Sequence, residues 1–211
     1  MTRQSATELV VLHAVRLLGF ADIDSIAERA GASYAKTLGI LSKAAEAGWV
    51  QSIAFADRKG WSLTDSGKAE NERELREERE TADPEDVVAN AYSLFLPLNA
   101  RFLRAITDWQ IKPTVLDRFA PNDHSDQVWD GQVLQELSTL GREVAPLLAR
   151  VVSVLARFEG YVERYESALN RGKNGGHDWI DKTHIDSCHR VWFQLHEDLI
   201  ATLGIDRGQE A

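Results

Sequence analysis

The sequence predicts a mainly α-helical protein in which three short helices and a β-hairpin are followed by a bundle of longer helices. Apolar residues recur at helical spacing through most of the 211 residues, and 44% hydrophobic content is enough to build a core. One stretch differs: residues 49–63 have the composition of two strands joined by a tight turn.

The first 48 residues contain the three short helices, which we expect over residues 5–18, 24–30 and 34–47. Residues suited to helix ends separate them: Gly19, Asp22 or Asp24, Gly31, Ser33 and Gly48. On the third helix, Leu38, Leu41 and Ala45 are expected to face the core.

The hairpin is expected to consist of strands over 49–55 and 61–63, joined by a turn over 56–60. Residues 64–67 then cap a further helix, whose residues 68–80 are almost all charged. Such a helix is expected to be solvated and crossed by i,i+4 ion pairs, for example between Glu72 and Arg76.

The remaining residues are expected to form a bundle of four or five helices. We expect a helix over 87–109 with a kink at Pro97, and a helix over 127–140 that breaks near Gly141. An apolar stripe from Leu147 to Leu169 predicts a third helix that reaches about Asn170, and a final helix is expected over 178–203. The predicted domains are therefore 1–66, a charged helical linker over 67–83, and a helical domain over 84–211.

Charge and cysteine content restrict the binding partners and the cellular compartment expected for the protein. The net charge is −9, yet residues 1–66 hold seven Lys or Arg and seven Asp or Glu, so the acidity lies outside the N-terminal part. This distribution permits binding to nucleic acid without favouring it. A single cysteine, the absence of an 18-residue apolar run and an N-terminus unlike a signal peptide predict a soluble cytoplasmic protein.

The stretch from Ser25 to Thr64 resembles winged helix-turn-helix transcriptional regulators of the MarR-like and related groups. The resemblance lies in three segments: IAERAGAS (26–33), LGILSKAAEAGWV (38–50) and WSLTDSG (61–67). It implies a winged helix that binds double-stranded DNA, with the second helix bracing the third in the major groove and the hairpin along the backbone or minor groove.

The long helical part departs from typical MarR proteins and is closer to two-domain regulators with a C-terminal sensor, such as the FadR-like branch of the GntR family. The sequence patterns of that branch are not found, so the subfamily is open. The geometry of DNA-binding winged helices gives the expected DNA contacts. At the exposed start of the third helix these are Ser33, Tyr34, Lys36 and Thr37. Lys43 is expected to contact phosphate, and the hairpin tip contributes Arg58 and Lys59. The alternative is a winged-helix module that contacts another protein.

The helical domain is expected to dimerise and to bind an organic effector, because it is rich in aromatic residues and arginine. The candidate effector-binding residues are Arg101, Trp109, Tyr161, His184, Cys188 and Trp192.

On the predicted final helix, His177, Asp181, His184 and Cys188 would project from one side. These are transition-metal ligand types, and Cys188 is also a candidate redox sensor, but their spacing matches no known zinc motif. We therefore assign no metal and no cofactor. The sequence also contains no phosphate-cradling loop, serine elbow or paired metal motif, so we expect no enzymatic activity and assign no catalytic residue.

Overall fold

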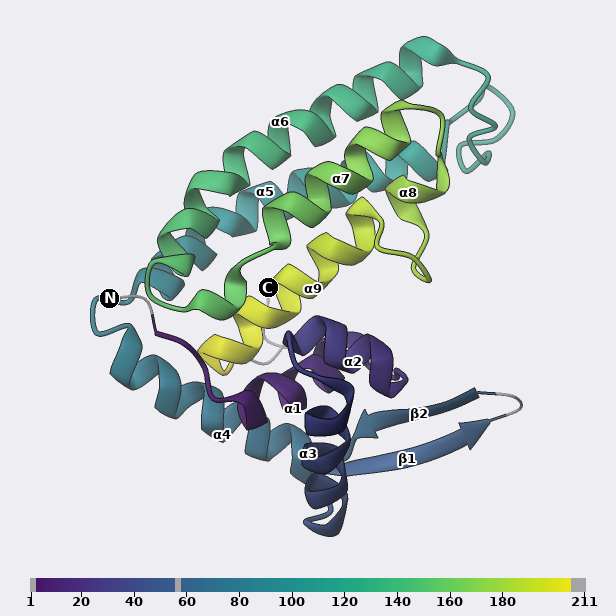
Figure 1. Ribbon diagram of the computed structural model, residues 1–211. Coiled ribbons are helices and arrows are strands. Elements are labelled where there is room, and N and C mark those ends of the chain that lie inside the picture. Colours follow the sequence, from purple (N-terminus) through teal and green to yellow (C-terminus); the bar gives the residue numbers. More distant parts are fainter. Residues whose placement is uncertain (1–2, 56–57, 206–211) are drawn as a thin grey trace. The chain divides into compact units, whose positions relative to one another are not determined.

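A computed structural model describes residues 3–55 and 58–205 of the protein (Figure 1). It is mainly helical with one small antiparallel sheet, as the sequence predicts. The chain divides into two compact units. The first consists of Met1–Glu85, Val154–Arg157 and Glu197–Ala211, and the second of Asp86–Ser153 and Phe158–His196. The expected boundary at residues 83–84 is close to the first division, but two later segments belong with the N-terminal residues rather than with the helical domain.

The first unit contains three short helices, a hairpin and one longer helix in the expected order. They are α1 (Thr7–Leu18), α2 (Ile23–Ala30), α3 (Tyr34–Glu46), β1 (Val50–Phe55), β2 (Arg58–Leu63) and α4 (Asp65–Ala82). The expected caps are present. The side chain of Asp22 accepts from Ser25 N at 2.8 Å, and that of Ser33 accepts from Lys36 N at 3.3 Å. These side chains satisfy backbone donors that have no partner within their helices.

The buried face of α3 differs from the expected one. Thr37, Leu41 and Ala44 are buried, whereas Leu38 is 38% exposed and Ala45 is also exposed. The prediction of Leu38 and Ala45 as core residues is therefore wrong. It chose the larger apolar side chains, but the small side chains of Thr37 and Ala44 allow α3 to pack closely on the core around Leu41.

The hairpin is longer than expected, because β2 begins at Arg58 and not at Trp61. Its register runs from Val50 opposite Leu63 to Phe55 opposite Arg58. Part of the expected turn therefore lies within β2, and its residues 56 and 57 lie outside the described part of the chain. Ala21 and Trp61 also exchange two backbone hydrogen bonds, of 2.8 and 3.2 Å, which tie the hairpin to the connection between α1 and α2.

The start of α4 closes this arrangement against the turn that follows α3. The Thr64 and Ser66 hydroxyls donate to the Gly48 carbonyl at 2.6 and 2.8 Å, and Gly67 N donates to Thr64 Oγ1 at 3.0 Å. A Cβ atom on Gly67 would lie 1.8 Å from the carbonyl oxygen of Trp49. Only glycine allows this approach of two backbone segments.

The charged helix α4 is part of the first unit and not a solvated linker. Asn71, Leu75 and Glu78 are buried along one of its faces, and Leu75 packs with Leu9 and Ala201. The recorded ion pair of Glu72 is with Arg16 at 2.9 Å, not with Arg76 as expected. A charged sequence does not reveal which of its polar residues find buried partners.

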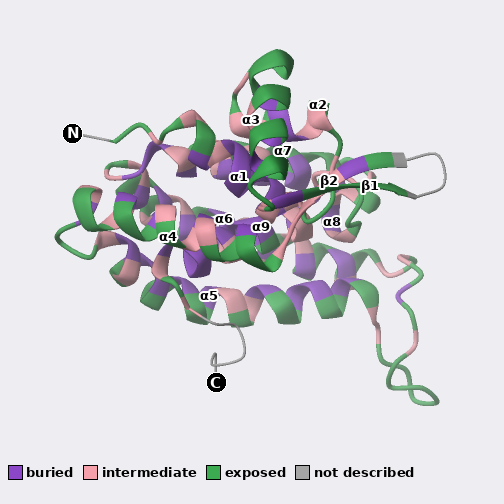
Figure 2. Cartoon of the chain, turned by 90° about the horizontal axis from the view of Figure 1, so that it is seen from below, coloured by how far each residue is buried: buried purple, intermediate pink, exposed green. Residues whose placement is uncertain are grey.

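The second unit contains α5 (Val87–Gln110), α6 (Gln127–Val152), α7 (Tyr161–Lys173), α8 (Asp178–Asp181) and the first part of α9 (Cys188–Leu203). A short 3-10 turn, Ala156–Phe158, precedes α7. Figure 2 shows the buried and exposed positions alternating along α5, whose buried side chains include Phe95, Phe102 and Trp109. No helix within the described ranges has both the length and the apolar character needed to span a membrane.

Three expected helix boundaries are wrong in this unit. Helix α6 continues through Gly141, where a Cβ atom would lie 3.0 Å from the Tyr165 ring, so this glycine serves close packing and not a helix end. The stripe from Leu147 to Leu169 is divided between α6 and α7. The expected final helix is also two helices, because the chain leaves α8 at Lys182 and α9 starts only after Ser187, whose hydroxyl accepts from Arg190 N at 3.1 Å.

The close approach at Gly67 generates a stability prediction. Gly67→Ala is expected to lower the free energy of unfolding by about 3 kcal/mol, because the new methyl group forces α4 away from the Trp49 carbonyl. The measurement is urea unfolding followed by far-ultraviolet circular dichroism. Gly39→Ala is the matched control, since a Cβ there meets no atom within 4 Å, and it should keep or raise the stability. Equal unfolding midpoints for the two variants would contradict the packing described.

Candidate functional site

The outward face of α3 is composed of small side chains with lysine along one edge. Opposite the buried Thr37, Leu41 and Ala44 lie the exposed residues Ala35, Gly39 and Ser42. Lys36 and Lys43, one heptad apart, lie on one flank of this face, and Tyr34, which is 50% exposed, lies on the other. Small side chains allow the helix axis to approach another molecule closely.

The structure separates the expected DNA contacts of α3 into two groups. Ser33, Tyr34, Lys36 and Lys43 are exposed, as that expectation requires. Thr37 is 0% exposed, so the expectation that its side chain lies on the surface is wrong. Lys36 Nζ donates to Thr7 Oγ1 at 2.6 Å, which holds this lysine beside the start of α1.

The hairpin brings further cationic residues close to its end. Lys59 is exposed on β2 opposite Ala54, and Arg58 begins the strand opposite Phe55, although its side chain lies outside the described part of the structure. Both were expected in the turn itself. Residues 34–63 carry four Lys or Arg and two Asp or Glu, so α3 and the hairpin are net positive within an acidic chain.

Sequence reasoning missed the outward position of Ala35, Gly39 and Ser42, because it took the start of α3 as the contact region and placed Leu38 and Ala45 on the buried face. Assigning Thr37 to the buried face, with Leu41 and Ala44, would have placed all three residues outward at about 100° per residue. Such small residues gave no indication of contact by their chemistry.

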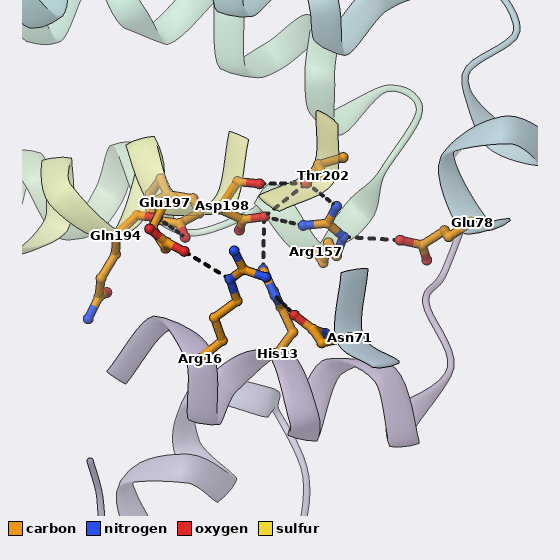
Figure 3. A network of polar contacts seen from close by, with 10 residues as sticks. His13, Arg16, Asn71, Glu78, Arg157, Gln194, Glu197, Asp198 and Thr202 are labelled. Atoms are coloured by element: carbon orange, nitrogen blue, oxygen red, sulfur yellow. Dashed lines mark hydrogen bonds and ion pairs between the residues drawn. The ribbon is translucent and has the colours of Figure 1, made fainter. Parts of the chain in front are cut away.

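A buried polar network holds α1 and α4 in place behind this surface (Figure 3). Asp198 lies at its centre and is 0% exposed. Its Oδ1 lies 3.0 Å from His13 Nε2 and also accepts from Arg157. Arg157 Nε donates to Glu78 Oε2 at 3.0 Å, and Arg157 Nη2 donates to Thr202 Oγ1 at 2.6 Å.

Two further contacts connect the same segments at the edge of this network. His13 Nδ1 lies 3.1 Å from Asn71 Oδ1 on α4. Arg16 donates to Glu72 at 2.9 Å and to Glu197 at 2.8 Å. All of these residues belong to the first unit, so residues from three distant parts of the sequence fix the helices on which α3 packs.

The charge state of Asp198 follows from these partners. Burial alone would raise the pKa of this carboxyl, but the attraction of Arg157 and His13 and the hydrogen bond from His13 outweigh burial, so its pKa lies well below the ordinary value. A lowered native-state pKa stabilises the fold above the ordinary carboxyl pKa of about 4, and this stabilisation is lost as the pH falls below it.

Asp198→Asn is therefore expected to lower the free energy of unfolding by about 3 kcal/mol at pH 7, because it removes one of the carboxylates that neutralise the buried Arg157 and leaves Glu78 to do so. The difference from the parent protein should narrow as the pH falls below about 4. Urea unfolding at several pH values measures both effects. Glu77→Gln is the control, since Glu77 forms an exposed pair with Arg73 and its loss should change little. A loss in Asp198→Asn no larger than in Glu77→Gln would contradict the role of the network.

The candidate effector residues do not form one site. Arg101 is paired with Glu136 at 2.8 Å and Glu143 at 2.5 Å, and His184 is exposed. Tyr161 and Trp192 are buried beside a void of about 10 Å³, which has no room for an organic ligand. Trp192 stacks on Phe102 with ring centroids 4.4 Å apart, so it belongs to the core of the second unit.

A cavity of about 470 Å³ lies elsewhere in the second unit, and Trp109 is the one expected effector residue that lines it. Its other lining residues come from the end of α5, the loop before α6, and α8 with its flanks: Gln110, Asn122, His124, His177, Asp178, Asp181 and Lys182. The volume lies within the range of small-ligand sites. Sequence reasoning assigned Asn122 and His124 only to a helix cap, because nothing in the sequence connects this loop to His177.

The expected stripe of metal-ligand types is broken by the end of α8. His177 and Asp181 line the cavity, whereas His184 is exposed between the two helices and Cys188 is buried at the start of α9. Among the residues that the structure describes, no group of three or more His, Cys, Asp or Glu side chains converges on a metal position.

Comparison with known proteins assigns no function to the outward face of α3 or to the cavity. No protein-family model matches the sequence, and no curated protein or solved structure matches it.

Cys188 is expected to be chemically inert in the folded protein. Burial raises the pKa of its thiol to about 12, and its side chain is 0% exposed. Iodoacetamide at pH 8 should leave the native protein unmodified and alkylate it fully in denaturant, as measured by mass spectrometry. Rapid modification of the native protein would restore Cys188 as a candidate redox sensor.

Proposed function

We propose that this protein is a cytoplasmic transcriptional regulator that binds duplex DNA through its first unit and a small effector through its second unit. The observation that carries the proposal is the exposed face of α3, where Ala35, Gly39 and Ser42 are flanked by Lys36 and Lys43. A helix with such a face can enter a major groove without steric obstruction, and lysines along one edge suit the phosphates that border the groove.

The arrangement of the first unit supports a winged helix. Three helices precede the hairpin, and α3 packs on α1 and α2 through a common core that includes Leu41, Val11 and Ile26. The Ala21–Trp61 hydrogen bonds tie the hairpin to the preceding helices, which would fix it as a wing beside α3, the helix proposed to enter the major groove. Lys59 on β2 would then contact the DNA backbone.

The start of α3 offers a second contribution to phosphate binding. Ser33 accepts from one backbone N–H, and the remaining N–H groups of the first turn carry the positive end of the helix dipole. Backbone donors of this kind position a protein on DNA without reading its sequence. In this proposal the Ala35 methyl group and the Ser42 hydroxyl on the outward face contact the base edges.

We propose that the protein acts as a homodimer, because two reading helices nearly double the DNA contact of one. The outer face of α5 supports this part of the proposal. Leu96 and Leu103 are 40 and 52% exposed on one edge of that face and Leu94 is 50% exposed on the other, and between Val87 and Ala100 the helix carries no charged residue.

A winged-helix module that binds another protein is the second candidate. Tyr34, Leu38 and Ile53 are 50, 38 and 37% exposed on α3 and β1, and such apolar side chains suit a protein partner. The balanced charge of residues 1–66 is also compatible with this alternative.

Fluorescence anisotropy distinguishes the two candidates. The protein is titrated with duplex DNA from upstream of its own gene and with a scrambled duplex, over a series of salt concentrations. Binding that weakens with salt supports the regulator, and a preference for one duplex identifies an operator. No binding to either duplex at low salt favours the protein-interaction module.

The lysines on the flank of α3 give a sharper form of the same test. Lys36→Ala and Lys43→Ala should each weaken binding to both duplexes to a similar degree. Each should also reduce the slope of log affinity against log salt concentration by about one, as expected for the loss of a phosphate contact. Lys173→Ala on α7 is the control and should leave binding unchanged. Equal affinities for all three variants would contradict the placement of DNA along this flank.

The outward face itself is tested by two identical substitutions at exposed helical glycines. Gly39→Glu places a carboxylate on the face proposed to enter the groove and should weaken DNA binding by about a hundredfold or more. Gly131→Glu on α6, outside the proposed DNA-binding unit, should leave DNA binding unchanged. Both variants should fold, since an added Cβ at either glycine meets no atom within 4 Å. Full DNA binding by Gly39→Glu would exclude α3 as the reading helix.

A further inference from the structure

One histidine of the 470 Å³ cavity is held in a fixed orientation by buried polar residues. His124 Nδ1 lies 2.9 Å from Asp130 Oδ2, and Asp130 Oδ1 accepts from Asn122 Nδ2 at 2.8 Å. Asp130 and Asn122 are only 8 and 9% exposed, so neither side chain is free to move. When Nδ1–H donates to this carboxylate, Nε2 is the remaining ring nitrogen that can bind a ligand.

The backbone at His124 is strained in a way that keeps this orientation. Its φ of 59° lies in the left-handed region, which costs a histidine energy. Asn122 Oδ1 accepts from His124 N at 3.1 Å, and Asn122 Nδ2 also donates to the Trp109 carbonyl at 3.0 Å. Three hydrogen bonds of Asn122 therefore hold the loop in this conformation.

A second histidine lies beside the first. The rings of His124 and His177 have centroids 4.5 Å apart and planes inclined by 52°. Both rings pack on Trp109, at 4.5 and 5.6 Å, and Trp109 itself is 1% exposed. The two imidazoles therefore cover the aromatic wall, which leaves no indole face for an organic cation.

The charge around the two imidazoles favours a cation. Asp178 and Asp181 line the cavity against the single ammonium of Lys182, and Asp130 adds a third carboxylate behind His124. The three carboxylates outnumber this ammonium group, so an anionic ligand is disfavoured. Neutral imidazole nitrogens are preferred ligands of divalent transition metals, and a carboxylate that accepts from the other ring nitrogen is the usual support of such a ligand.

We propose that this cavity binds a divalent transition-metal ion through His124 Nε2 and the His177 imidazole. Water would complete the coordination, because among the described residues no group of three or more His, Cys, Asp or Glu side chains could hold a metal ion. The site differs from the stripe noted in the sequence: it joins His177 to a residue 53 positions earlier and not to His184 or Cys188. The regulatory meaning of the ion, as the effector of the second unit, rests on the proposed function, whereas its binding does not.

The test is isothermal titration of the full-length protein with Zn²⁺ in the absence of DNA. One ion per chain is expected. His124→Asn, in which asparagine tolerates the left-handed backbone, and His177→Gln should each weaken binding at least about tenfold. Asp130→Asn should also weaken it by about tenfold, because the amide no longer fixes the Nδ1 proton.

His184→Gln is the matched control, since this exposed histidine lies seven residues beyond His177 and outside the cavity. It should bind Zn²⁺ as tightly as the parent protein does. Circular dichroism of each variant confirms that the fold is retained. No uptake of Zn²⁺, or uptake unchanged in both His124→Asn and His177→Gln, overturns the proposal. Because the titration contains no DNA, these outcomes are independent of whether the protein binds duplex DNA.

Discussion

The buried carboxylate of Asp198 is the constraint on which the first unit depends. Taking a carboxylate and the Arg157 guanidinium out of water is costly, and the cost is offset only while all partners remain in place. Those partners lie on α1, on α4 and in the segment before α7, so the network requires residues 13, 71, 78 and 157 to meet the end of α9. The surface of α3 rests on α1 and therefore depends on residues from the C-terminal third of the sequence.

This dependence explains which features the sequence could predict. The helix starts at Asp22, Ser33 and Thr64 are local, since a side chain and a backbone donor only a few residues away define each of them. The polar network is not local: His13 and Asp198 are 185 residues apart, and a charged helix such as α4 gives no indication of which residues are buried. Gly141 shows the same limit, because the Tyr165 ring that requires a glycine there lies on another helix.

The two candidate sites were predictable to different degrees. On α3 the sequence predicted the helix and its exposed lysines, but the wrong assignment of Leu38 and Ala45 to the buried face hid the outward position of Ala35, Gly39 and Ser42. In the cavity it identified His177 and Trp109, yet the break after α8 removed His184 and Cys188 and the fold supplied His124 instead. Residue chemistry indicated the ligand types, and tertiary structure determined which of them meet.

Hydrogen–deuterium exchange of the full-length protein, with and without duplex DNA at low salt, tests the central claim most directly. The account predicts slower amide exchange at residues 33–43 and 50–63 when duplex is present, with no change in α6 and α7. Unchanged exchange across α3 and the hairpin, or protection confined to the second unit, would contradict the claim that the outward face of α3 binds DNA.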